Sequence, residues 1–263
     1  MKIKRIEKND IVLLDNIQHD TFFISDSDSL YYYTQNGCLY SKNKTTLLYV
    51  PNIKGAMYVP DHVRIIERRV FNFQEIKHII LPEVRVIKDQ AFKNCEMLHA
   101  AYMPYVQTIH AYAFAICTEL TKICMPEVIQ VNNFAFWGTN INCLNLYHIT
   151  SIGNNAFAYC KHLETINIKT DKSLYIGKYA FADSGVQNVY ISAQNGLSIA
   201  TGAFCNCKDL EYVKFVGIEG LDLEVFTSCP KLKQVIIPDE CVIRKTLTAI
   251  SYKIVRVAER RNF

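Results

Sequence analysis

Ten cysteines and seven histidines are the residues of this chain whose types could carry chemistry. A thiolate beside an imidazole can act as a nucleophile, and several converging thiols and imidazoles can bind zinc. The closest local approach to a metal motif is "CNC" at Cys205–Cys207, which supplies one pair only. The chain contains no Gly-rich phosphate loop, no G-x-S-x-G and no H-E-x-x-H. The sequence therefore predicts a protein that is not an enzyme, with no catalytic residue, metal site or cofactor; the alternative is a thiol-dependent enzyme.

The elements that would position these residues repeat along the chain. One phenylalanine recurs in the same context eight times, at intervals of 21 to 24 residues, and alanine precedes it in six of the eight: Phe71, Phe92, Phe114, Phe136, Phe157, Phe181, Phe204 and Phe226. A period of 20–29 residues with recurring leucine-like positions is typical of leucine-rich repeats. A single unit cannot bury its own apolar face, but stacked neighbours can.

The third unit shows how each repeat folds. Leu120, Ile123 and Met125 have the pattern of a short strand, with Ile123 and Met125 pointing inward by two-residue alternation. Pro126 ends the strand because proline offers no N–H to a ladder. The segment "IHAYAF" (109–114), which precedes this strand in the chain, is expected to cross the opposite side as a turn or short helix. The expected fold is a curved, β-rich or α/β solenoid with a parallel sheet on one face and turns or short helices on the other.

Half of the cysteines occupy one position in the repeat, three residues after the phenylalanine: Cys95, Cys117, Cys160, Cys207 and Cys229. Where cysteine is present there, the leucine-like residue comes six after phenylalanine; where it is absent, an apolar residue comes five after. This predicts a turn with two lengths. We expect these five thiols to be reduced and buried inside the turn, since free cysteine is commonly buried.

The two ends of the chain depart from the repeat. Residues 1–56 are expected to form an N-terminal β-hairpin cap, with turn signals at Asn36-Gly37 and "KNK" (42–44) and with "SDSDS" (25–29) as a loop. Residues 57–241 carry the eight repeats. Residues 242–263 form a degenerate ninth repeat with Thr248 at the phenylalanine position, and a local charge of +5 from six basic and one acidic side chain. This end is either a solvated cap or a basic docking site.

The repeats resemble those of the BspA-like leucine-rich repeat family, whose units run approximately I-G-x-x-A-F-x-x-C-x-x-L-x-x-I-x-I-P. The matching segments here are "IGNNAFAYCKHLETINI" (152–168), "IGKYAF" (176–181) and the lead-in "NGCLYSKNKTTLLYVP" (36–51). The resemblance covers roughly residues 36–257. It implies a binding module without a catalytic motif, often on a cell surface.

The outward positions of the strands are the candidate binding surface. Alternation places no acidic residue among them, while Tyr and basic residues, which are favoured at binding hot spots, do occur. The candidate site residues are His78, Tyr102, Lys122, Asn145, Asn167, Tyr190, Tyr212, Lys214 and Arg256. The expected function is non-catalytic binding of a protein partner through this face. The alternatives are an ordinary amphipathic sheet face and a cell-surface adhesin or host-interaction protein of the same fold.

Composition sets the remaining expectations. The net charge of +4 at pH 7 is too small to indicate a nucleic-acid partner. The N-terminal segment has no apolar run of the length that a secretory signal needs, and no window approaches a membrane span. We therefore expect a monomer in the cytoplasm, without membrane insertion; a surface or secreted location is the alternative that the family resemblance implies.

Overall fold

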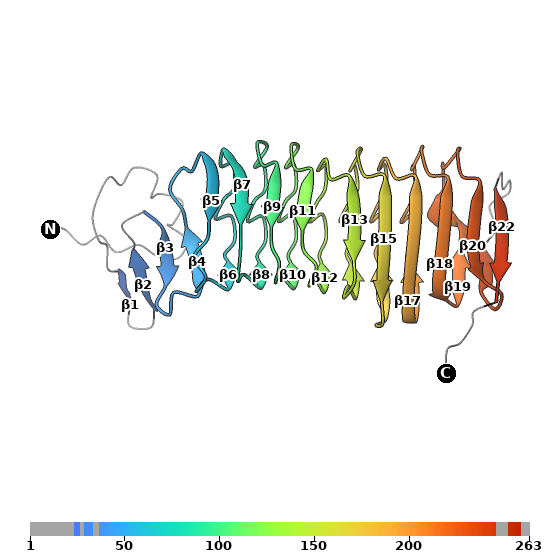
Figure 1. Cartoon of the computed structure of the whole chain (residues 1–263), viewed down its shortest axis with the longest axis horizontal. Coiled ribbons are helices and arrows are strands. Elements are labelled where there is room, and N and C mark those ends of the chain that lie inside the picture. The colour runs from blue at the N-terminus through green and yellow to red at the C-terminus, as the bar shows by residue number, and fades with distance from the viewer. Residues whose placement is uncertain (1–23, 27–28, 34–36, 246–251, 259–263) are drawn as a thin grey trace.

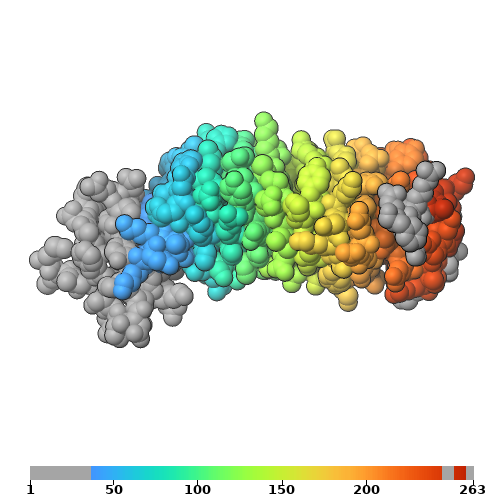
Figure 2. Space-filling view, turned by 60° about the horizontal axis from the view of Figure 1, so that its bottom comes forward, coloured from blue at the N-terminus to red at the C-terminus, as the bar shows by residue number. Residues whose placement is uncertain are grey.

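The computed structural model describes residues 24–26, 29–33, 37–245 and 252–258. The chain is a coil of stacked turns, elongated along the stacking direction (Figures 1 and 2). Each regular turn contributes a longer strand, a short strand and a turn that carries the repeated phenylalanine. The fold is a β-solenoid with almost no helix in its described part.

The longer strands form one face, which we call the long-strand face. Inward positions in register stack apolar on apolar, as in Ile166, Val189 and Val213, while the flanking positions point to solvent. Two parallel sheets follow one another along this face: β5-β7-β9-β11 and β13-β15-β17-β18-β20-β22. The strands are β5 (Gly55–Tyr58), β7 (Ile76–Ile80), β9 (Ala100–Tyr102), β11 (Lys122–Cys124), β13 (Cys143–Leu146), β15 (Thr165–Thr170), β17 (Asn188–Ile199), β18 (Tyr212–Ile218), β20 (Gln234–Pro238) and β22 (Lys253–Val257).

A second side of the coil is also a parallel sheet, built from strands of only two or three residues (Figure 1). Each strand buries one isoleucine or valine and pairs in register with the next turn, as Ile109 does with Val131. The strands are β6 (Ile65–Ile66), β8 (Val86–Ile87), β10 (Thr108–Ile109), β12 (Gln130–Val131), β14 (Ser151–Ile152) and β16 (Leu174–Ile176). Strand β17 bends across the corner and pairs with both β15 and β16. Near the C-terminus, β19 (Gly220–Asp222) pairs with β21 (Val242–Lys245).

The phenylalanine turns close the core. From Phe71 to Phe204 the neighbouring rings are stacked at 4.6–5.4 Å between centroids, with planes within 6° of parallel. The Phe92 N–H donates to the Ala113 carbonyl at 2.7 Å, and equivalent bonds recur from turn to turn. The sequence analysis expected turns or short helices on this side. The described part contains turns and a single 3₁₀ helix, η2 (Leu223–Phe226).

Each regular turn holds two residues with a left-handed backbone conformation. One lies two positions before the phenylalanine and the other two positions after it. Around Phe157 these are Asn155 (φ 55°) and Tyr159 (φ 62°). For residues other than glycine and asparagine, this backbone conformation costs about 1–2 kcal/mol each. The inter-turn bonds hold this geometry, because the Asn155 and Tyr159 N–H groups donate to Lys178 and Ala182 carbonyls of the next turn.

The two ends continue the sheets differently. At the N-terminal end β1 (Ile24–Asp26), β2 (Ser29–Tyr33), β3 (Leu39–Ser41) and β4 (Thr46–Tyr49) are antiparallel, and β4 then pairs in parallel with β6. The turn at 42–44 between β3 and β4 has Lys44 at φ 60°, as its hairpin signal predicts. At the C-terminal end β22 pairs with β20. Residues 1–23 and Thr248 lie outside the described residues.

Candidate protein-binding face

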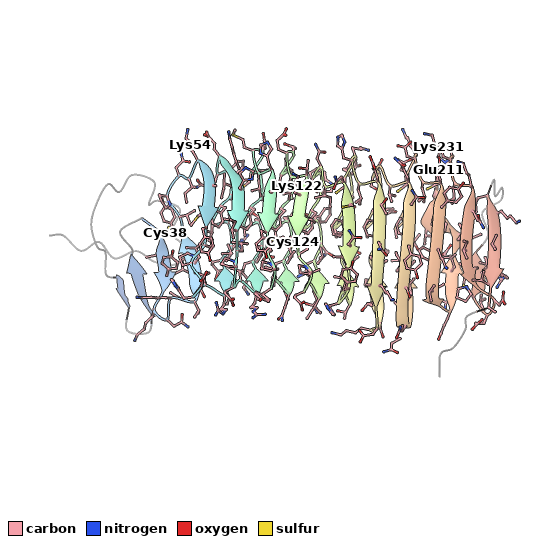
Figure 3. The ribbon with its side chains drawn as sticks, viewed as in Figure 1. Cys38, Lys54, Lys122, Cys124, Glu211 and Lys231 are labelled. Carbon is pink, nitrogen blue, oxygen red and sulfur yellow. The ribbon has the colours of Figure 1, made fainter. Side chains whose placement is uncertain are left out.

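The long-strand face carries two rows of outward positions, one on each side of the buried middle row. The structure places eight of the nine candidate residues in these rows, exposed or half-buried: His78, Tyr102, Lys122, Asn145, Asn167, Tyr190, Tyr212 and Lys214. Figure 3 labels Lys122 and Cys124 one below the other along β11, and the strand pairing places one of them in each row. None of the outward positions on β5 to β22 holds an acidic residue, as the alternation predicts.

Arg256 does not belong to these rows. It lies opposite Ile237, which is a buried inward position, and its guanidinium donates to the carbonyl oxygens of Asp239 and Cys241. The sequence analysis placed it outward by extending a period of 22 residues past Phe226. The last turn is shorter, because Ile254 pairs with Val235 nineteen residues before it, whereas Val213 and Val235 are twenty-two apart. The outward positions of β22 are therefore Lys253 and Val255.

Over β15 to β20 the face is hollowed into an open depression of about 430 Å³. Its lining is a grid of two rows with four side chains each. One row is Thr165, Asn188, Tyr212 and Gln234; the other is Asn167, Tyr190, Lys214 and Ile236. Ile166, Val189 and Val213 line it between the rows. The structure thus brings together four of the predicted residues, while His78, Tyr102, Lys122 and Asn145 lie along the face outside this lining.

Two lysines flank the tyrosines of the depression. The Lys214 ammonium lies 5.7 Å from the centroid of the Tyr190 ring, directly across the β17–β18 pair. The Lys233 ammonium lies 5.5 Å from the Tyr212 ring and also forms an ion pair with Glu211 at 2.6 Å. Lys233 was not predicted from the sequence, because it precedes the outward position Gln234 and approaches the Tyr212 ring only through its long side chain.

The neutral polar side chains that line the depression are not used in hydrogen bonds within the described part of the chain. Within the described chain, the side chains of Thr165, Asn167, Asn188 and Gln234 make no hydrogen bond with another residue. Side-chain amides elsewhere in the repeat are used internally: the side-chain Oδ1 of Asn154 accepts a hydrogen bond from the Lys178 backbone N–H at 2.8 Å. The grid therefore presents amide and hydroxyl groups that can bond to a ligand without breaking an internal bond.

The five cysteines of the repeat form a buried column, as expected. Each thiol donates to the carbonyl oxygen of the repeated phenylalanine one turn earlier, at 2.9–3.3 Å. Two turns that lack cysteine place a hydroxyl at the same position: Thr139 donates to Phe136 and Ser184 to Phe181, at 3.0 and 2.7 Å. The sequence analysis did not identify Thr139 and Ser184. Their place three residues after phenylalanine, where a small hydrogen-bonding residue recurs, is the signal that would have found them.

The environment of these thiols opposes nucleophilic chemistry. Burial raises the pKa of the Cys160 thiol to about 12, outweighing its hydrogen bond with Thr139. Burial likewise raises the pKa of Cys117. The Cys229 thiol lowers the pKa of Cys207 by hydrogen bonding, but Cys207 is wholly buried. Of the ten free cysteines Cys143 alone is exposed, and it lies on the strand face rather than in a cleft with a base. A thiolate nucleophile needs both access and a low pKa.

Two further features were searched in the described residues. No three His, Cys, Asp or Glu side chains there converge in a way that could hold a metal ion. No helix there is long and apolar enough to cross a bilayer.

Comparison with known proteins assigns the fold to a family. The model of the BspA type leucine rich repeat region matches residues 49–160 and 130–249 with six copies, which together span most of the chain. The protein belongs to this family, which confirms the resemblance read from the sequence. No curated protein matches the chain significantly.

Solved leucine-rich repeat proteins are similar over most of the chain. One from Bacteroides ovatus is 19% identical, with 92% of this chain and 79% of that chain covered and a TM-score of 0.41. A leucine rich cell surface protein from Faecalibacterium prausnitzii is 17% identical, covering 93% and 96%, with a TM-score of 0.34. The T. pallidum leucine rich repeat protein is 16% identical, covering 89% and 99%, with a TM-score of 0.43.

Proposed function

We propose that the protein is a non-catalytic interaction module that binds a protein partner on its long-strand face. The observation that carries this proposal is the depression over β15–β20, where Tyr190 and Tyr212 remain 38% and 46% exposed at its centre. Exposed tyrosines bounded by uncommitted polar groups have the composition of interface hot spots, which are enriched in Tyr.

The dimensions of the face fit a protein partner. Ten strands spaced about 4.8 Å apart give a face roughly 43 Å long. A standard interface needs about 800 Å² on each partner, which such a face can supply. The backbone beneath it is held by strand pairing on both sides, so the face can bind without first becoming ordered, and this lowers the entropic cost of association.

The test begins with finding the partner by photo-crosslinking in the native host. A benzophenone amino acid at Asn167, inside the depression, should capture a protein that the same probe at Tyr175 on β16 does not capture. The purified partner is then titrated against the wild-type protein and against Tyr190→Ala plus Tyr212→Ala. The double variant should lower affinity at least about tenfold, as expected for hot-spot tyrosines, with an unchanged circular dichroism spectrum.

The matched control removes two tyrosines outside the strands of this face. Tyr105 and Tyr175 are 42% and 46% exposed, close to the values of the tested pair. Tyr105→Ala plus Tyr175→Ala should leave partner affinity within about twofold. Equal affinity of the wild-type protein and a properly folded Tyr190→Ala plus Tyr212→Ala variant would exclude this part of the face as the binding site.

A further inference from the structure

The lysines around the depression differ in whether a carboxylate of the chain neutralises them. On the last turns two lysines are neutralised within the chain: Lys231 pairs with Asp209 at 2.7 Å and Lys233 with Glu211 at 2.6 Å. Figure 3 shows Glu211 and Lys231 together at one edge of the face. Lys214, inside the depression, has no carboxylate partner among the described residues; its neighbour is the Tyr190 ring at 5.7 Å.

A lysine ammonium without a carboxylate, half-buried beside an aromatic ring, favours an incoming anion. The rest of the lining also favours a negatively charged ligand, because no residue that lines the depression is acidic and would repel it. The acids nearest to the grid lie at its edge: Glu211 is already paired, and Glu164 precedes Thr165 on β15, two strands away from Lys214. Opposite charges across an interface set specificity and accelerate association.

The other residues of the grid indicate which kind of molecule would supply the negatively charged group. Ile236 lies next to Lys214 in the same row, and Val189 and Val213 line the space between the rows, so apolar contact is available beside the cation. Thr165, Asn167, Asn188 and Gln234 add amide and hydroxyl groups that can bond to a peptide backbone.

We propose that the depression receives an extended acidic segment of the partner protein, with an Asp or Glu carboxylate on Lys214 and an apolar side chain on Ile236. This inference rests on the proposed function and names the chemistry of its partner. A grid without acidic side chains and an unpaired lysine within it together give charge complementarity to such a segment.

The experiment uses the full chain and a random peptide library displayed on phage. Peptides enriched on the wild-type protein should be rich in Asp and Glu and should include aliphatic residues. Synthetic versions of them should bind at least about tenfold more weakly to Lys214→Gln and retain affinity for Lys214→Arg. Replacing their Asp and Glu by Asn and Gln should have the same effect as Lys214→Gln, and added salt should weaken binding. The matched control Lys231→Gln, at the edge, should change affinity by less than about twofold.

Several results would overturn the proposal. Enrichment of neutral or basic peptides, absence of enrichment, or equal binding to Lys214→Gln would exclude the acidic segment. If Tyr190→Ala plus Tyr212→Ala abolishes binding of the native partner while Lys214→Gln does not, the binding face stands and the acidic chemistry fails. A dimer of the free protein, dissociated by Tyr190→Ala plus Tyr212→Ala in light scattering, would assign the depression to a second copy. Glycan-array binding that depends on the two tyrosines but not on Lys214 would assign it to a carbohydrate.

Discussion

Replacing Phe157 by alanine should lower the free energy of unfolding by roughly 3–5 kcal/mol. The Phe157 ring is completely buried and is stacked on both sides, at 5.2 Å on Phe136 and 5.4 Å on Phe181, with planes 4° from parallel in each pair. Truncation removes about 1.5–3 kcal/mol of apolar burial. The remainder comes from the cavity, because the strand ladders on both sides of the coil prevent the turns from closing around it.

The assay is guanidinium unfolding followed by the fluorescence of Trp137, the single tryptophan, which lies next to Phe136 and contacts Tyr159 edge-on. Phe73→Ala is the matched control, because this phenylalanine is 71% exposed and should change stability by no more than about 0.5 kcal/mol. Phe157→Leu, which keeps most of the volume but loses the stacked ring, should cost no more than about 1.5 kcal/mol. An unfolding midpoint of Phe157→Ala equal to that of Phe73→Ala would refute a phenylalanine stack as the source of stability.

Three further predictions follow from the same turns. Iodoacetamide at neutral pH should label exposed Cys143 first and leave the five column thiols unmodified, whereas all ten cysteines should react after unfolding without reductant, as peptide mass spectrometry would show; native disulfides would contradict this. Above pH 9.0 the unfolded chain releases the Cys160 proton while the folded chain, with a pKa of about 12, retains it. Stability should therefore fall between these values by up to about 1.4 kcal/mol per pH unit from this thiol, and Cys160→Ser should reduce the slope in pH-dependent unfolding. Gly185→Ala should destabilise by about 1–3 kcal/mol or more, since its Cβ would lie 2.0 Å from the Lys161 carbonyl oxygen. Gly138→Ala, with open space but φ 69°, should cost only about 1–2 kcal/mol in thermal unfolding, and equal effects of the two would argue against that close approach.

The sequence alone determined the repeat, the phenylalanine stack and the two outward rows. These features depend on residue type at a constant spacing, and parallel strands in register convert constant spacing into columns. That is why Tyr190 and Tyr212 could be assigned to the outward side of the strands, and why the absence of acidic residues from the face could be predicted. The same reasoning was wrong for Arg256, because the last turn is shorter than the period and this displaces the register of β22.

Tertiary structure alone decided the rest. A strand of two residues such as Thr108–Ile109 has no recognisable pattern of its own and exists because a turn on each side pairs with it. The acceptor of the Cys160 thiol, the Phe136 carbonyl, lies 24 residues earlier and meets it only when the turns stack. Tertiary structure also decides which charged side chains near the depression have an ion-pair partner. The ammonium groups of Lys214 and Lys233 are chemically identical, so the sequence does not distinguish them. The neighbouring turn supplies Glu211 to Lys233 and only the Tyr190 ring to Lys214, so that the first cation is neutralised by a carboxylate and the second is not.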